Sequence, residues 1–372
     1  MTRTIHFRRT ARGFSLLELM VAVAISSMLL MGVVALFVSS RASYETTEKL
    51  SRIQENGRYA LDQLANDIRS AGYQGCSRPV GSGARRAGFN LNTIEPRLRP
   101  SAVWDFTAPI EGFQGTGAST FAPNLATALN PVALPSPAPR GIADVLVLRI
   151  PRRDTAPMIL AAKQANASAA LVVEIPDPLQ QTGPAVITDC LARTYFQITR
   201  FNGNQVFHEQ SQNFNDAGQR TASLRHVYLK GAEIVPLTTV MYYLAPRDQQ
   251  AAQAVPMRLS LYRREGTNAT EEIAEGIDRM EIRYGVDTTS DGRVDNYVDA
   301  NAVANWNAVY SVQISLLARA PEAYGTELDN QQYTLLMAGS NGVAAVTAGP
   351  FADRFQRKVF TATAALRNQI ID

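Results

Sequence analysis

The feature that most constrains this chain is an uninterrupted apolar run near its N-terminus. The run extends from Phe14 to Val38, contains no proline, and carries one charged side chain, Glu18. Because a helix rises about 1.5 Å per residue, the run is long enough to cross the roughly 30 Å hydrocarbon core of a bilayer. Residues 1–13 before it contain four arginines and no acidic residue. Such a basic stretch favours the cytoplasmic side, so we expect a single-pass chain whose C-terminal part lies outside the cytoplasm.

Three kinds of N-terminal segment fit a run of this type. A secretory signal peptide cut after Ala-Val-Ala at 22–24 would be cut in the middle of the run, which continues to Val38 and is too long for a signal core. A plain signal anchor explains the hydrophobicity but leaves Glu18 unexplained. A carboxylate at membrane depth costs on the order of 3 kcal/mol unless it is paired. The third kind is a prepilin.

The residues Arg12-Gly13-Phe14-Ser15-Leu16-Leu17-Glu18-Leu19 resemble the class III signal of type IV pilins and of type II secretion pseudopilins. This resemblance implies that a prepilin peptidase cuts after Gly13 and methylates the new N-terminal residue, Phe14. It also implies that Glu18, at the fifth mature position, is the assembly residue. The motif covers only about 25 residues, but glycine, phenylalanine, glutamate and a long apolar run must all fall in register.

The physical chemistry of the segment agrees with this resemblance. Cleavage would leave a charged amine on Phe14, and methylation would keep that charge. Glu18 lies about one helical turn further on, so an amine from its own chain or from a neighbour can neutralise it. Pairing between chains would make the register of assembly depend on Glu18.

The helix is predicted to continue beyond the membrane run, over residues 39–72. An apolar face recurs at steps of three and four residues, at Leu50, Ile53, Gly57, Leu61, Leu64, Ile68 and Ala71. The opposite face, expected to be solvated, carries Arg52, Glu55, Arg58, Asp62 and Asp67. Gly72 is the predicted C-cap.

A β-rich head is predicted for residues 73–372. Residues 77–141 are rich in glycine, proline and alanine, which predicts turns and irregular loops. Eight later runs have strand patterns: 143–150, 170–175, 194–201, 238–244, 258–263, 279–286, 309–318 and 358–366. No helix is predicted between consecutive strands, so the fold class is α+β, pilin-like, with a long N-terminal helix packed on a mainly antiparallel sheet.

Parts of the head resemble one subgroup of pilins. The stretches Leu259–Arg264 and Glu275–Gly285, with Ala143–Leu148 as an earlier strand, are similar to PilW-like minor pilins and to the related J-type pseudopilins. The resemblance implies a structural subunit rather than an enzyme. Its implied partners are other minor and major pilins, the prepilin peptidase, the inner-membrane assembly platform and a tip adhesin.

Charge and cysteine usage restrict the other possibilities. The formal charge of +3 comes from the leader, because 32 basic and 33 acidic side chains remain without it. A near-neutral mature chain has no general attraction to nucleic acid. Cys76 and Cys190 lie in no CxxC pair, and they are either two free thiols or, outside the cytoplasm, one disulfide.

One loop has the composition of a metal site. Asp287, Asp291 and Asp295 surround Gly292, and acids at such spacing can converge on a hard cation such as Ca²⁺. Thr289 stands where a further acid is expected and no bidentate glutamate closes the loop, although Asp299 could contribute. The alternative is an Asp-Gly turn that needs no metal.

No catalytic motif is found in the sequence. His208 and His226 have no nucleophile motif near them, and a lone histidine in a β-rich domain is usually structural. No cofactor is required by any motif. We therefore expect a minor pilin in the bacterial inner membrane, with its head in the periplasm, that later joins a pilus at its tip or in its initiation complex. A type II secretion pseudopilin and a membrane-anchored periplasmic binding or adhesive domain are the alternatives.

Overall fold

The computed structural model describes residues 15–73, 75, 89–91, 103, 106, 108–189, 192–215, 219–224, 226–254, 256–323, 327–339 and 342–368. For residues 89–91, Ala42 and Gln249 it describes the backbone only. The chain divides into two compact units, one up to Ser51 and one from Arg52 onward, and each is described by itself.

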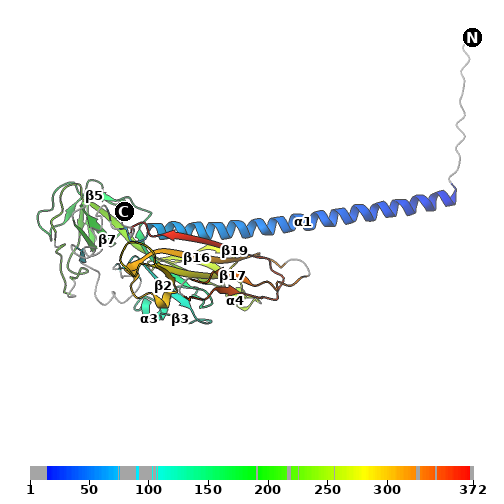
Figure 1. Ribbon diagram of the computed structural model, residues 1–372. Coiled ribbons are helices and arrows are strands. Elements are labelled where there is room, and N and C mark those ends of the chain that lie inside the picture. Colours follow the sequence, from blue (N-terminus) through cyan, green and yellow to red (C-terminus); the bar gives the residue numbers. More distant parts are fainter. Residues whose placement is uncertain are drawn as a thin grey trace, which may run out of the picture. The chain divides into compact units, whose positions relative to one another are not determined.

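Helix α1, Leu16–Ser70, confirms the predicted long N-terminal helix (Figure 1). Within the first unit, the large apolar side chains from Leu16 to Val38 are exposed around the whole helix. Among the described residues, α1 is the one helix long and apolar enough to cross a membrane by length and composition.

The part of α1 that belongs to the head packs through one stripe. Ile53, Ala60, Leu64 and Ile68 are buried at steps of seven, four and four residues, which places them on one face of the helix. A side chain at Gly57 would overlap the ring of Phe360, so this glycine lets the helix approach the sheet closely.

The helix ends as predicted. Gly72 follows the last turn with φ of +69° and donates its N–H to the Arg149 carbonyl at 2.9 Å. A positive φ at this position is the common way for a glycine to terminate a helix.

The first sheet of the head is built around β11, Glu233–Ala245. The second half of β11 pairs with β4, Val145–Pro151, and with β12, Ser260–Glu265, both antiparallel. Beyond them lie β2, Ile110–Gly115, β3, Phe121–Ala122, and β13, Thr270–Glu275. The short helices α3, Leu125–Leu129, and α4, Gln249–Gln253, accompany this sheet.

The second sheet has the order β15-β14-β16-β19 and is antiparallel throughout. Its strands are β14, Ile277–Val286, β15, Asn296–Val298, β16, Val309–Arg319, and β19, Arg357–Ala365. Single 3-10 turns, η1 at Ala300–Ala302 and η2 at Trp306–Ala308, connect β15 to β16. The hairpin of β17, Tyr333–Leu336, and β18, Val346–Ala348, packs on its outer face.

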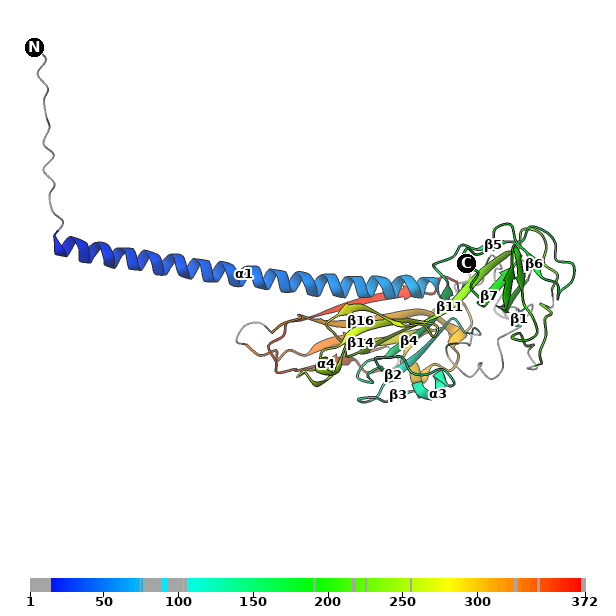
Figure 2. The same ribbon diagram turned by 180° about the vertical axis from the view of Figure 1, so that it is seen from behind.

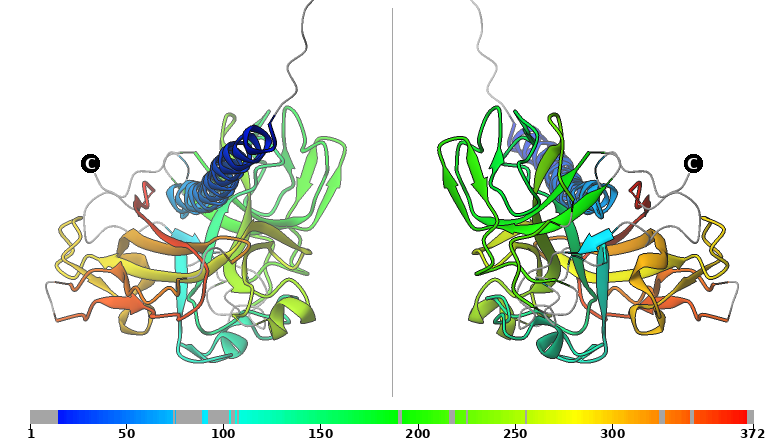
Figure 3. Two further views of the ribbon diagram at one scale, coloured as in Figure 1. Left: turned by 90° about the vertical axis from the view of Figure 1, so that its right-hand side faces the viewer. Right: turned by 90° about the vertical axis from the view of Figure 1, so that its left-hand side faces the viewer.

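The main core lies between the two sheets and α1. One apolar cluster joins Leu64 of α1, Tyr242 of β11, Ile282 of β14 and Ile314 of β16, and all four are fully buried. Side chains alternate along each strand, so Met241 and Tyr243 face a separate cluster on the other side of β11. Figure 3 shows the view along α1, with β19 beside the helix.

A small closed barrel occupies the end of the head where α1 stops (Figure 2). Its strands are β5, Met158–Ile159, β6, Leu171–Val172, β7, Gly183–Thr188, β8, Arg193–Ile198, β9, Arg200–Asn202, β10, Gln205–Phe207, and the first half of β11. Strand β11 pairs with β7, and β7 pairs with β8, which continues through Thr199 into β9. Strand β9 pairs with β10, and β10 pairs with β6. A bridge between Val173 and Leu160 then leads to β5, which pairs with β11 and closes the barrel. The interior is filled with apolar side chains such as Leu160, Ile187 and Phe196. Strand β1, Phe89–Leu91, joins β8 in parallel.

The predicted α+β fold with a mainly antiparallel head is confirmed. The longer predicted strands appear as β4, β11, β12, β14, β16 and β19. The barrel was not predicted, because most of its strands are only two to six residues long. The region expected to be irregular also contains β2, β3 and α3, which that prediction did not include.

Candidate functional site: the assembly segment of helix α1

The predicted cleavage and methylation residues, Gly13 and Phe14, lie outside the described residues, which begin at Ser15. Ser15 precedes the first turn of α1, and its Oγ accepts a hydrogen bond from the Glu18 N–H at 3.1 Å. The Ser15 N–H in turn points to Glu18 Oε2 at 3.5 Å. This reciprocal arrangement is a capping box, which explains locally why the helix begins here.

Glu18 therefore lies in the first turn of α1, on a helix surface that is otherwise apolar as far as Val38. Glu18 is exposed, and within the part of the chain that the structure describes it forms hydrogen bonds with Ser15 alone. An isolated carboxylate on an apolar surface is costly in lipid unless a cation neutralises it. Because its carboxylate is exposed, Glu18 can form an ion pair with a charged amine at the same end of the helix.

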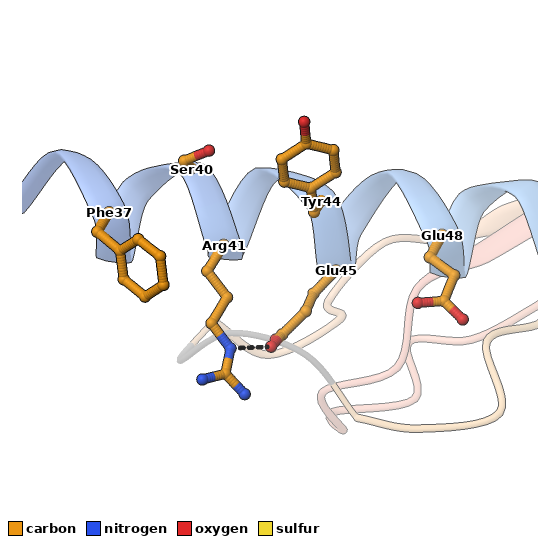
Figure 4. A pocket seen from close by; sticks show the side chains of 6 residues that line it. All are labelled: Phe37, Ser40, Arg41, Tyr44, Glu45 and Glu48. Carbon is orange, nitrogen blue, oxygen red and sulfur yellow. Dashed lines mark hydrogen bonds and ion pairs between the residues drawn. The ribbon is translucent and has the colours of Figure 1, made fainter.

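The apolar surface of α1 changes character between Phe37 and Glu48 (Figure 4). Phe37 is followed one turn later by Arg41, whose Nε lies 3.2 Å from Glu45 Oε1. Tyr44 is exposed beside them. Both charges of the pair are well exposed, so this pair contributes little to stability. The segment marks the end of the membrane-length run.

Asp67, near the other end of α1, corrects the sequence analysis. We predicted a solvated side chain, but Asp67 is fully buried. Its carboxylate accepts a hydrogen bond from the Tyr242 hydroxyl at 2.6 Å and from Arg263 Nε at 3.3 Å, and it also pairs with Arg153. Its partners come from β11, β12 and the segment after β4, so this one carboxylate fixes α1 to the first sheet. Sequence periodicity placed Asp67 near the edge of the polar face and gave no sign of these distant partners.

Asp144 is a second buried carboxylate that the sequence did not reveal. It accepts hydrogen bonds from the Gly115 N–H at 2.9 Å and from the Ile282 N–H at 2.8 Å, which links the first sheet to the second. Burial raises the pKa of Asp144 to about 7. Burial, followed by the nearby charge of Asp144, raises the pKa of Glu281 to about 8.

The predicted calcium loop is closed by backbone groups. Asp287 accepts hydrogen bonds from the N–H groups of Ser290 and Gly292, at 2.6 and 2.9 Å, and Asp295 accepts from Thr288 and Thr289. Asp291 accepts the Arg293 N–H at 2.9 Å. Among the described residues, no group of three or more His, Cys, Asp or Glu side chains is placed to hold a metal ion. Ca²⁺ binding, which would require the loop to rearrange, stays a prediction.

Cys76 and Cys190 both lie outside the described residues, so their predicted pairing stays a prediction. The residues next to them are informative. A side chain at Gly75, which has φ of +71°, would overlap the side chain of Thr188. The chain just before Cys76 therefore touches the chain two residues before Cys190.

The two histidines of the head have structural surroundings. His208 is buried in the barrel, and its ring nitrogens lie 2.8 Å from the Ala222 carbonyl oxygen and 2.9 Å from that of Ala169. Burial lowers the pKa of His208. His226 Nε2 lies 2.9 Å from Asp189 Oδ2. The ring nitrogens of His208 thus hold two backbone segments of the barrel together, and His226 links its own segment to Asp189.

Two regions of the chain match known protein families. Residues 8–34 match the prokaryotic N-terminal methylation motif, and residues 241–368 match the family of type IV pilus-assembly protein W. No curated protein and no solved structure matches the chain. The fold and the N-terminal segment thus define a pilin-like protein with a class III prepilin signal. Its resemblance to the PilW family of type IV pilus assembly is confirmed.

The matched regions fall on definite parts of the structure. The N-terminal match covers the start of α1 with Glu18, and the C-terminal match runs from β11 to just beyond β19. The barrel strands β5 to β10 lie outside both matches. Both matched families consist of structural proteins.

Proposed function

We propose that this protein is a minor pilin-like structural subunit that takes part in type IV pilus assembly, in the initiation or tip complex. It is inserted in the bacterial inner membrane with its head in the periplasm. The prepilin peptidase cuts it between Gly13 and Phe14 and methylates Phe14. The assembly platform then delivers it to a filament with other minor and major pilins, and a tip adhesin is a further partner.

One observation carries this proposal: a methylation motif and a PilW-type region stand on one chain, and α1 begins within the motif. Glu18 is in the first turn of that helix, three residues after the capping Ser15. A positive amine of a neighbouring subunit would neutralise it when α1 leaves the lipid. Glu18 is thus the residue through which this chain registers against its neighbour.

The barrel supports a place at the tip rather than in the shaft. It adds a second compact core to the pilin-like part of the head. A bulky head obstructs dense helical packing of identical subunits, whereas a subunit at the end of a filament has free space on one side. The same reasoning would apply to a type II secretion pseudopilin, and co-purification with pilus rather than secretion subunits separates the two.

Processing is the experiment that tests the proposal. Mass spectrometry of the mature protein from membranes should give an N-terminal peptide that begins with N-methyl-Phe14. The substitution Gly13→Leu should leave the precursor uncut, whereas Thr10→Ser in the same leader should not. A wild-type protein that keeps Met1, or that begins at Ser26 or later, would contradict the prepilin assignment.

A further inference from the structure

Strand β19 is the longest edge strand among the strands that the structure describes. It ends the second sheet, pairs with β16 on one side only, and is nine residues long. The other sheet edges are short or charged: β3 has two residues, β15 has three, and β13 carries Glu271, Glu272 and Glu275. Proteins commonly blunt exposed edges in these ways because an open edge invites another strand.

The backbone groups that β19 presents outward can be assigned from the ends of its ladder. The Ala320 N–H bonds to the Gln356 carbonyl at 2.9 Å, and the Leu366 N–H bonds to the Tyr310 carbonyl at 2.8 Å. The register between these bonds is unshifted, so alternate residues of β19 bond to β16. The residues in between direct their N–H and C=O groups away from β16: Arg357, Val359, Thr361, Thr363 and Ala365.

This outer row is both accessible and unused. Thr361 and Thr363 are exposed. No described residue forms a hydrogen bond with the outward backbone groups from Val359 to Ala365. The strand is also held in place, because Phe360 packs against α1 at Gly57. The edge is therefore preorganised for a partner strand.

The charges around the edge specify the chemistry of that partner. From Val359 to Ala365 the strand has no charge and no proline, whereas Arg354 and Lys358 precede this stretch and Arg367 follows it. All three cations are exposed and have no acidic partner among the described residues. Arg357 differs, because Asp278, Asp329 and Asp353 surround it at 2.6–2.8 Å.

A second copy of this chain does not fit this edge. Antiparallel pairing of two β19 strands would bring the cationic start of one strand to Arg367 at the end of the other. Like charges directly across a strand pair are destabilising. The complementary partner is a strand with an uncharged centre and acidic ends.

We propose that the outer edge of β19 is the docking site for an extended strand of a neighbouring assembly subunit, uncharged in its centre and acidic at its ends. Main-chain hydrogen bonds to the outward groups of Thr361 and Thr363 supply the affinity, and the flanking cations select the partner. The identity of the neighbour as another subunit rests on the proposed function, whereas the edge and its charge preference do not.

Binding of a strand-like probe tests the edge directly. Full-length protein in detergent micelles is titrated with a fluorescent peptide as long as β19, with alternating Val and Thr in its centre and Asp at both ends. Thr361→Pro and Thr363→Pro each remove an outward N–H without removing a bond to β16. They should weaken binding about tenfold or more, because a main-chain hydrogen bond is lost and the approach is blocked. Thr361→Val and Thr363→Val keep the N–H and should bind as wild type. Equal binding by the proline and valine variants, or no binding by wild type, would overturn the proposal.

The charge preference is tested without a backbone change. Wild-type protein should bind the Asp-ended peptide more tightly than the same peptide with Lys at both ends. The exposed pair Lys358→Glu and Arg367→Glu together should reverse this order. A preference that remains unchanged in the double variant would show that these cations do not select the partner.

Filament experiments separate this inference from the proposed function. In sheared filaments, Thr361→Pro should be depleted relative to Thr361→Val, and backbone amides from Val359 to Ala365 should exchange more slowly than in the isolated protein. If wild type enters filaments and the proline variant enters equally, the docking site is wrong while the function stands. If wild type itself never enters filaments, the proposed function is wrong. The peptide titrations then still test, on their own, whether the outer edge of β19 binds a strand.

Discussion

Helix α1 carries a carboxylate near each end, and the two lie in opposite environments, one exposed and one buried. Glu18 lies on an exposed apolar surface and, among the described residues, forms hydrogen bonds with Ser15, just before the first turn. Asp67 is fully buried and is held by Tyr242, Arg263 and Arg153. The head satisfies its buried charge from its own chain, whereas the carboxylate on the membrane-length segment is exposed. One helix thus places its two carboxylates in opposite environments, and the proposed function assigns the exposed one to a partner chain.

Removing the carboxylate of Asp67 should have the largest effect on stability. Asp67→Ala leaves Arg263 and the Tyr242 hydroxyl without their partner in the core, and breaking a buried ion pair from one side costs about 3–5 kcal/mol. Thermal unfolding of the full-length protein in detergent should show a clearly lower Tm. Asp62→Ala, at an exposed position on the same helix, is the control and should change little. Equal melting of the two variants would show that the Asp67 cluster does not hold α1 to the head.

Loss of the predicted Cys76–Cys190 disulfide should have the next largest effect on stability. In the chain-entropy model, closing a loop of more than a hundred residues is worth about 4–5 kcal/mol, and measured values often fall below that. Periplasmic protein should resist alkylation until it is reduced. Cys76→Ser and Cys190→Ser should each lower the Tm, and the double variant should be no worse than either single one. Two thiols that react without reduction would rule out the bridge.

The raised pKa values of Asp144 and Glu281 predict an unusual pH dependence. Both groups bind a proton more tightly in the folded state than in the unfolded state, where carboxyl pKa values are near 4. Their contribution to stability is therefore complete at acidic pH and is lost as pH rises through about 7 and then about 8. The Tm should be higher at pH 5 than at pH 8.5, and Asp144→Asn with Glu281→Gln should reduce that difference. The charged groups around them are Asp299, Arg279, Arg283 and Glu111, and variants of these should shift the midpoint. A Tm that rises from pH 5 to 8.5 would contradict the assignment.

Binding of Ca²⁺ should have the smallest effect on stability. Extracellular sites of this kind have dissociation constants of about 10⁻⁴–10⁻³ M, so millimolar Ca²⁺ would add only about 0.4–1.4 kcal/mol. The Tm should rise by a few degrees at most, and Asp291→Ala should remove the rise. If chelator and Ca²⁺ give the same Tm, the Asp287–Asp295 loop is an ordinary turn closed by its own backbone N–H groups.

The sequence predicted the parts of the molecule that depend on long, regular patterns. The apolar run, the stripe from Ile53 to Ile68 and the stop at Gly72 are local signals, and α1 follows them. The long strands β11, β14 and β16 were also predicted, because alternation over many residues is hard to mistake.

The missed features depend on residues that are distant in sequence. The barrel closes through short strands and one bridge between Leu160 and Val173, and of its strands only β6 and β8 fall on runs with a predicted strand pattern, 170–175 and 194–201. Asp67 and Asp144 look like ordinary surface acids until folding brings Tyr242 and Ile282 to them. The register of β19, on which its open edge depends, is likewise visible only in the folded sheet.

The comparison between the two ends of α1 is tested most directly by the fate of Glu18→Gln. The amount of this variant in sheared filaments, relative to membranes, is measured against wild type and against Glu45→Gln on the same helix. The variant should be cut and methylated at Phe14, should melt like wild type, and should be absent from filaments, because only the bond to a neighbour's amine is lost. Glu18→Gln in filaments at the wild-type level would contradict the claim that this carboxylate is reserved for a partner chain.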